Sequence, residues 1–147
     1  RLYTSHDVQW VEIAAYLGSL VEELEASMKA AGRDHTLVLI ADPALKVPTD
    51  KAVSIGVIVT ELVTNAYKYA YPSGTVGEIR VRVEPGAAGA VELIVEDDGI
   101  GWTGEGEARG SGLGSRIVKA MAINLQSAVD YAGAEKGTRV RLSFGPF

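Results

Sequence analysis

Apolar positions recur at helical spacing in two long stretches of the chain. In residues 8–31 they return every three or four positions, and Gly32 marks the expected stop. In residues 50–70 a second stripe falls within one arc at about 100° per residue. Its members are Ile55, Val59, Leu62, Val63, Ala66 and Ala70. Both stretches predict amphipathic helices that bury one face, and Asp50 is expected to cap the second.

Shorter apolar segments predict strands. Residues 36–41 form a compact apolar run and residues 45–47 a second, weaker one. Residues 78–84 and 90–96 alternate apolar and charged side chains, which is the pattern of a half-buried strand. The turn-forming residues 85–89 lie between them, so these two strands are expected to form a hairpin.

The last third of the chain repeats this pattern. A glycine-rich segment opens a predicted helix at 114–125, and residues 127–131 and 138–144 are expected to form a second hairpin. Helices grouped between runs of antiparallel strands favour an α+β fold. We expect a two-layer sandwich with a mixed, mostly antiparallel sheet and about three helices on one face. The polar segment Trp102–Ser111 is expected to be a mobile loop.

Composition narrows the class of protein. The 147 residues suit one domain, and 47% hydrophobic with 22% charged residues is a globular composition. A net charge of -5 argues against nucleic acid as a partner, and no apolar run approaches the ~20 residues of a membrane span. The absence of cysteine excludes disulfides and thiolate zinc sites, and is compatible with a cytoplasmic protein. We expect a fragment in which residues 1–7 are linker and 8–147 are the domain.

A polar ridge on the second helix carries the first candidate chemistry. Glu61, Asn65 and Lys68 stand at i, i+4 and i+7, so they share a face. An amide oxygen suits magnesium, a carboxylate can accept a proton, and an ammonium can neutralise phosphate. Ordinary solvated helix residues would give the same spacing, so this ridge alone leaves both interpretations open.

Two glycine-rich segments carry the rest. Asp97, Gly99 and Gly101 follow directly on a predicted strand, where an acid could accept a hydrogen bond from the exocyclic amine of adenine; a plain turn is the alternative. Asp98 is expected to face solvent. The segment 110–114 precedes a helix, so its backbone amides are available to phosphate. Thr138 begins the last predicted strand, where its hydroxyl could reach a phosphate or a water.

In this order and spacing, the three blocks resemble the ATP-binding catalytic domain of bacterial sensor histidine kinases. ELVTNAYKYA resembles the asparagine box, EDDGIG the first glycine box and GSGLGSRIV the second. The resemblance covers nearly the whole chain and implies the Bergerat fold shared with gyrase, Hsp90 and MutL. The details look most like the HisKA_2 and HWE branch.

The resemblance implies a role for each matching residue. Asp97 would bind the adenine amino group, Asn65 would coordinate Mg²⁺ on the phosphates of ATP, and Glu61 would be the catalytic base or would orient a metal-bound water. The remaining nucleotide-binding residues would be Lys68, Tyr69, Gly99, Gly101, Gly110, Gly112, Leu113, Gly114 and Thr138. Two residues depart from the pattern: Tyr69 stands where the branch often has histidine, and Ser115 replaces an apolar residue.

The partners follow from the same resemblance. ATP would phosphorylate a histidine on separate dimerisation helices, and a response regulator would act downstream. His6 lacks the sequence context of a phosphoacceptor, and His35 is expected to be a surface residue. Alternatives are a serine kinase of the anti-sigma-factor type, a degenerate partner-binding module that no longer uses ATP, or a purely structural α+β domain.

Overall fold

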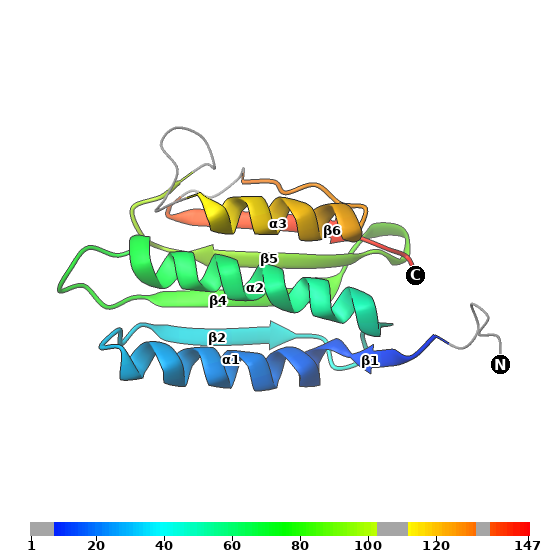
Figure 1. Ribbon diagram of the computed structural model, residues 1–147, viewed down its shortest axis with the longest axis horizontal. Helices are drawn as coiled ribbons and strands as arrows, with labels where there is room; N and C mark the ends of the chain where they lie inside the picture. The colour runs from blue at the N-terminus through cyan, green and yellow to red at the C-terminus, as the bar shows by residue number, and fades with distance from the viewer. Residues whose placement is uncertain (1–7, 103–111, 132–135) are drawn as a thin grey trace.

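The computed structural model describes residues 8–102, 112–131 and 136–147 of the chain. These residues form two layers, with α-helices packed on one face of a four-stranded sheet (Figure 1). The strand order is β2-β4-β5-β6. The expected α+β sandwich is therefore confirmed.

Three α-helices of the described chain run side by side across the sheet: α1 (Ile13–Ala30), α2 (Thr49–Tyr69) and α3 (Leu113–Asn124) (Figure 1). The central one is α2, which packs against both of the others. All six residues of its predicted apolar stripe are buried. This stripe therefore lies against the sheet, and the polar ridge of the same helix is more exposed.

The sheet is mixed, as predicted. Strand β2 (Thr36–Ala41) runs parallel to β4 (Glu78–Pro85), whereas β5 (Val91–Asp97) is antiparallel to β4 and to β6 (Thr138–Phe144). The short 3₁₀ helix η2 (Ala87–Gly89) closes the predicted β4–β5 hairpin. Every second residue of β4, β5 and β6 faces the helices and is buried, so the alternation in the sequence sets the register of the sheet.

The first helix begins later than predicted. Residues 8–12 continue its apolar spacing, yet β1 (Trp10–Glu12) pairs with β3 (Lys46–Pro48) in a separate two-stranded sheet. The helix starts only at Ile13, whose N–H donates to the carbonyl of Leu45 at 3.2 Å. A distant strand therefore determines the local structure here. The predicted stop at Gly32 is consistent with its φ of 82°, which favours glycine.

Two other local predictions were wrong. Asp50 does not cap α2, because the helix begins at Thr49 and Asp50 lies within the first turn. The predicted strand 127–131 is reduced to a single bridge between Asp130 and Arg141. After α3 the chain turns sharply, with Gln126 at φ 53°, and the Ser127 N–H donates back to Ala122. The segment then lies beside β6, where Ser127 Oγ donates to the Ser143 carbonyl at 2.8 Å, but it forms no ladder with that strand.

The face of the sheet away from the helices is charged. Glu96 is 6% exposed there, and its carboxylate accepts hydrogen bonds from Arg80, Arg82 and Arg139 at 3.1–3.3 Å. Burial raises the pKa of this carboxyl, but the three guanidinium groups together hold it below its ordinary value. No helix in the described residues is long and apolar enough to cross a membrane.

Candidate nucleotide-binding site

A small cavity lies between α2 and the ends of β5 and β6. Asn65 and Asp97 line it together with Thr138, so the helix ridge and the strand-end acid meet at one place. The walls are completed by Leu62, Ala66, Val95, Trp102, Tyr131 and Val140. Its volume is about 20 Å³, enough for about one water molecule and far below that of a purine.

Asp97 is held rigidly at the last position of β5. Only 4% of its surface is exposed, and its Oδ1 accepts a hydrogen bond from the Gly99 N–H at 2.9 Å. Its partner in the β5–β6 ladder is Thr138, which is 6% exposed. Within the described residues the Thr138 hydroxyl has no hydrogen-bond partner. A buried unsatisfied hydroxyl costs free energy, so the site is suited to a polar ligand or a water.

The first glycine segment joins this acid to the end of α2. The Ile100 N–H donates to the Ala70 carbonyl at 2.8 Å, and a Cβ at Gly99 would overlap that same carbonyl. Gly101 has a φ of 87° and passes close to the backbone of Gly137. Only glycine combines this close approach with this conformation. The glycines therefore fix the distance between Asp97 and the helix that carries Asn65.

The second glycine segment meets the ridge of α2. Gly112, at φ 77°, precedes α3, and Leu113 begins the helix with its side chain 57% exposed. A Cβ added at Gly114 would lie 3.0 Å from Glu61 Oε2 and 3.6 Å from Asn65 Nδ2. The predicted base and amide therefore lie against the N-terminus of a helix, where the backbone amides attract anions. Gly110 lies outside the described residues.

The structure does not bring Lys68 to this cavity. Its exposed side chain lines a separate cavity of about 410 Å³ with Arg33, Tyr71 and residues of the loop after α2. Tyr69 is half-buried at the last position of α2 and is not among the residues that line the Asn65–Asp97 cavity. Their roles in phosphate binding stay predictions.

Two aromatic residues that the sequence analysis did not single out also line the cavity. The rings of Trp102 and Tyr131 form an edge-to-face pair with centroids 5.4 Å apart and planes at 73°. Trp102 follows the first glycine segment directly. This position, close to a strand-end acid, was the one signal in the sequence that could have indicated Trp102 as a site residue. Tyr131 gave none, because it approaches the cavity from the segment that was predicted to be a strand.

The polar residues around the strand end hold it in place. Asp98 is exposed, as predicted, and its hydrogen bonds with Arg80 at 2.9 and 3.0 Å lower its pKa. The Tyr71 hydroxyl donates to the Glu78 carbonyl and accepts from the Asp98 N–H, and burial raises the pKa of this phenol. Asp98 therefore acts as an anchor for β4 and β5, while Asp97 turns into the cavity.

The donor atoms beside Gly114 are of the kind that a hard cation prefers. A carboxylate oxygen of Glu61 and the amide oxygen of Asn65 lie within 4 Å of the same point, the position that a Cβ would take at Gly114. Among the described residues there is no group of three histidine, cysteine or acidic side chains that could hold a metal by itself. The donor set thus suits a magnesium ion that takes further oxygen ligands from phosphate and water.

A buried strand-end acid, a facing helix amide and glycine-shaped backbone define a nucleotide-binding domain of the α+β class. The chain belongs to the family of histidine kinase-, DNA gyrase B- and HSP90-like ATPases, whose model matches residues 50–146. This family membership supports the use of ATP by the domain.

Known relatives agree with this class. The chain is 28% identical to Blue-light-activated histidine kinase 2 of Erythrobacter litoralis over 138 residues, or 90% of this chain and 38% of that relative. It is 32% identical to Sensor histidine kinase PdtaS of Mycobacterium tuberculosis over 98 residues, or 64% of this chain and 19% of that relative. The chain thus spans well under half the length of the curated relatives that it matches.

A solved structure supports the same fold. The histidine kinase domain of the Erythrobacter litoralis EL346 blue-light activated histidine kinase superposes with a TM-score of 0.74 at 28% identity. The match covers 91% of this chain and 61% of that one. The Bergerat fold that the motifs implied is therefore the fold of this chain.

Proposed function

We propose that the chain is the ATP-binding catalytic domain of a sensor histidine kinase. It transfers the γ-phosphate of ATP to a histidine nitrogen on separate dimerisation helices, and a response regulator receives the phosphoryl group downstream. The observation that carries this proposal is the shared cavity of Asn65, Asp97 and the unsatisfied Thr138 hydroxyl. The histidine kinases among its relatives support the choice of acceptor.

Asp97 and Thr138 recognise the base. The carboxylate of Asp97 accepts a hydrogen bond from the exocyclic amine of adenine and also accepts the one from the Gly99 N–H. The Thr138 hydroxyl lies one strand away and bonds to the purine or to a water beside it. Because Asp97 is buried, a base that lacks a donor at this position loses this hydrogen bond and binds more weakly.

The phosphates lie toward the N-terminus of α3. The first backbone amides of α3 lie at the N-terminus of the helix, where amides and the helix dipole favour a bound anion. Asn65 would hold Mg²⁺ together with phosphate oxygens, and Glu61 lies beside it. The metal would neutralise charge that develops on the transferred phosphoryl group.

The transfer itself needs positioning more than covalent chemistry. The histidine nitrogen attacks the γ-phosphorus, the bond to the β,γ-bridging oxygen breaks, and ADP leaves. Glu61 accepts the proton that the imidazole loses, which is a role open to a half-exposed carboxylate on the ridge.

Nucleotide binding is tested by thermal unfolding of the chain with ATP and Mg²⁺. A ligand that binds only the folded state raises the Tm, so millimolar ATP should raise it for the wild type and not for Asp97→Asn. Lys119→Gln, an exposed change on α3, is the matched control and should keep the full shift. No shift in the wild type would leave a partner-binding module as the better interpretation.

Phosphoryl transfer is tested separately on the full-length gene product with radiolabelled ATP. The label should be stable in alkali and lost in acid, as expected of phosphohistidine, and Glu61→Gln should reduce it by about 100-fold or more. An acid-stable label would instead identify a hydroxyl acceptor and a serine kinase.

A further inference from the structure

One edge of the sheet carries unused hydrogen-bonding groups. Strand β2 has β4 on one side and, within the described residues, no strand on the other. The Thr36 N–H donates to Gly77 at 3.0 Å and the Asp42 N–H to Val83 at 3.1 Å, so the even-numbered amides face β4. Because the direction alternates along a strand, the amides of Leu37, Leu39 and Ala41 face outward.

A side chain of α1 occupies the first of these amides. Glu25 Oε2 accepts a hydrogen bond from the Leu37 N–H at 2.9 Å. The amides of Leu39 and Ala41 have no such partner among the described residues. Glu25 therefore protects the start of the edge, and the rest stays available for pairing.

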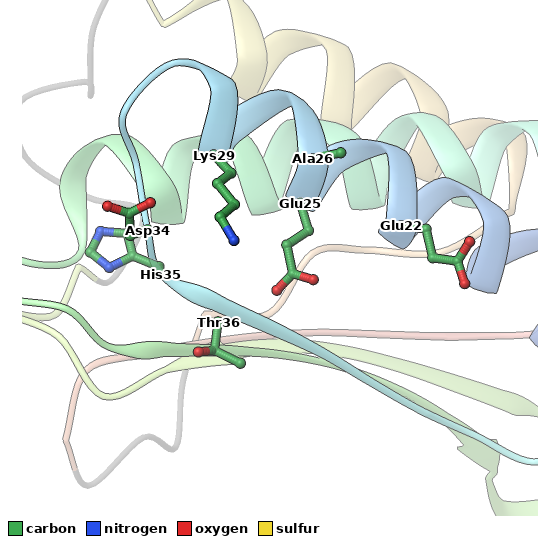
Figure 2. Close-up of a pocket in the computed structure, with 7 residues that line it drawn as sticks. All are labelled: Glu22, Glu25, Ala26, Lys29, Asp34, His35 and Thr36. Carbon is green, nitrogen blue, oxygen red and sulfur yellow. The ribbon is translucent and has the colours of Figure 1, made fainter.

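A large cavity lies at the start of this edge. Its volume is about 600 Å³, within the range of about 300–1,000 Å³ that is usual for ligand pockets. Figure 2 shows Glu25 and Lys29 reaching from α1 toward Thr36 at the start of β2. Glu22, Asp34, His35 and Ala26 complete the lining. The cavity has α1 on one wall and reaches β2 at Thr36, its first residue. An extended chain seated there can continue along the outer edge of β2 toward Leu39 and Ala41.

The charge of the groove selects the occupant. Glu22, Glu25 and Asp34 carry three negative charges, and Lys29 is the one permanent cation among the described residues that line it. We propose that this groove binds an extended peptide segment rich in lysine or arginine, which adds a strand to the outer edge of β2. The peptide backbone bonds to Leu39 and Ala41, and its basic side chains meet Glu22 and Glu25. This surface shares no lining residue with the cavity of Asn65 and Asp97, so the proposal does not rest on ATP binding.

Binding of the segment competes with the existing cap. The incoming backbone carbonyl takes the Leu37 N–H, and the released Glu25 carboxylate pairs with a basic side chain of the peptide. The exchange replaces one charge-assisted hydrogen bond by a backbone bond and an ion pair, so the edge opens only to a peptide of the right charge.

The probe is the peptide acetyl-KVKVK-amide, titrated into the isotopically labelled protein and followed by amide NMR shifts. The shifts should map to residues 37–41 and α1, and hydrogen exchange at Leu39 and Ala41 should slow. The peptide acetyl-EVEVE-amide, with the same apolar content and the opposite charge, should not bind. Equal binding of both peptides would overturn the proposal.

Two methylated isomers of the basic peptide separate backbone pairing from charge attraction alone. One carries N-methyl groups on its valine amides and the other on its lysine amides, so only one of them blocks the edge that faces β2. One isomer should lose at least tenfold in affinity while the other binds like the parent. If both bind like the parent, no strand is added and the proposal fails.

Variants of α1 test the charge. The double substitution Glu22→Gln and Glu25→Gln keeps a hydrogen-bond acceptor for the Leu37 N–H. It should lower the affinity for the basic peptide by about fivefold to tenfold. Glu23→Gln makes a matched change on the same helix outside the groove and should leave the affinity unchanged. An equal loss of peptide affinity in all variants would contradict the proposal. A stable dimer of the protein alone that pairs through β2 would also contradict it.

Discussion

Asp97 and Thr138 are direct partners across β5 and β6, and both side chains open into the same cavity. The acid has a hydrogen bond from Gly99, whereas the Thr138 hydroxyl has none within the described residues. The pair therefore combines a fixed acceptor with a group whose hydrogen bonds await a ligand. This asymmetry makes the hydroxyl a direct probe of what the cavity binds.

Thr138→Val keeps the shape of this side chain and removes its hydroxyl. Relief of a buried unsatisfied group should raise the stability of the ligand-free protein by about 1 kcal/mol, or a Tm increase of about 2–4 °C. The same change should weaken the binding of ATP severalfold, as measured by calorimetry. A variant less stable than the wild type, with unchanged ATP affinity, would show that the hydroxyl has only a structural role.

Gly114→Ala tests the contact between α3 and the ridge of α2. The added methyl would lie 3.0 Å from Glu61 Oε2, the end of a flexible side chain that can move away. The helix itself gains by about 0.5–1 kcal/mol from the exchange of glycine for alanine. The variant should therefore fold at least as well as the wild type and lose most of its phosphorylation activity.

Gly18→Ala is the matched control for that experiment. Gly18 lies inside α1, and a Cβ there would meet nothing within 4 Å. It should raise the Tm by a similar increment and leave phosphorylation unchanged. Equal activity in the two alanine variants would mean that Glu61 does not need its position beside Gly114.

The elements whose patterns are periodic could be predicted from the sequence. The stripe of α2 and the alternation of β4 and β5 gave the helix, the hairpin and the mixed sheet, because one buried face determines each of them. The pairing of β1 with β3 could not be predicted, since Trp10–Glu12 continue a helical spacing and find their partner in Lys46–Pro48, far along the chain. Contacts between distant segments leave no local pattern.

The site divides in the same way. The motifs indicated Asn65, Asp97 and Thr138, and the structure brings these three to one cavity. His35, expected on the surface, is instead half-buried: its Nδ1 accepts the Gly77 N–H at 3.1 Å, and its ring contacts Tyr67 and Tyr71. The Tyr67 hydroxyl, 32 positions away, donates to the His35 carbonyl, and Gly77 lies 42 positions away. Spacing along the chain could not reveal partners at such distances.

Glu96 should make the stability of the domain depend on acid pH. Its folded-state pKa is lowered from the ordinary value of 4.5, so the folded state binds fewer protons than the unfolded state. Its stabilisation is complete above about pH 4.5 and is lost as the pH falls through the lower folded value. Urea unfolding at several pH values should show this decline in the free energy of unfolding.

Glu96→Gln removes the charge that three guanidinium groups share. At pH 7 the variant should be less stable by about 1–3 kcal/mol, since a buried partner of several cations is lost. Its deficit against the wild type should shrink as the pH falls below about 4.5. Glu84→Gln, in an exposed pair 3.9 Å from Arg82, should change stability by less than about 0.5 kcal/mol at any pH.

Trp102 should report the entry of the nucleotide. The cavity has a volume of about 20 Å³ in the described structure, so a purine can enter only if residues that line it move. We expect the pair of Trp102 and Tyr131 to be among them, because both rings line the cavity. The chain has one other tryptophan, Trp10, which is 51% exposed and lies in β1. In a Trp10→Phe background, ATP should therefore shift or quench the remaining tryptophan emission, with a midpoint equal to the calorimetric Kd.

The double variant Trp10→Phe and Trp102→Phe is the control for this experiment and should abolish the signal. Emission that does not change at saturating ATP in the single-tryptophan protein would mean that the nucleotide binds without displacing this pair, which would contradict this prediction.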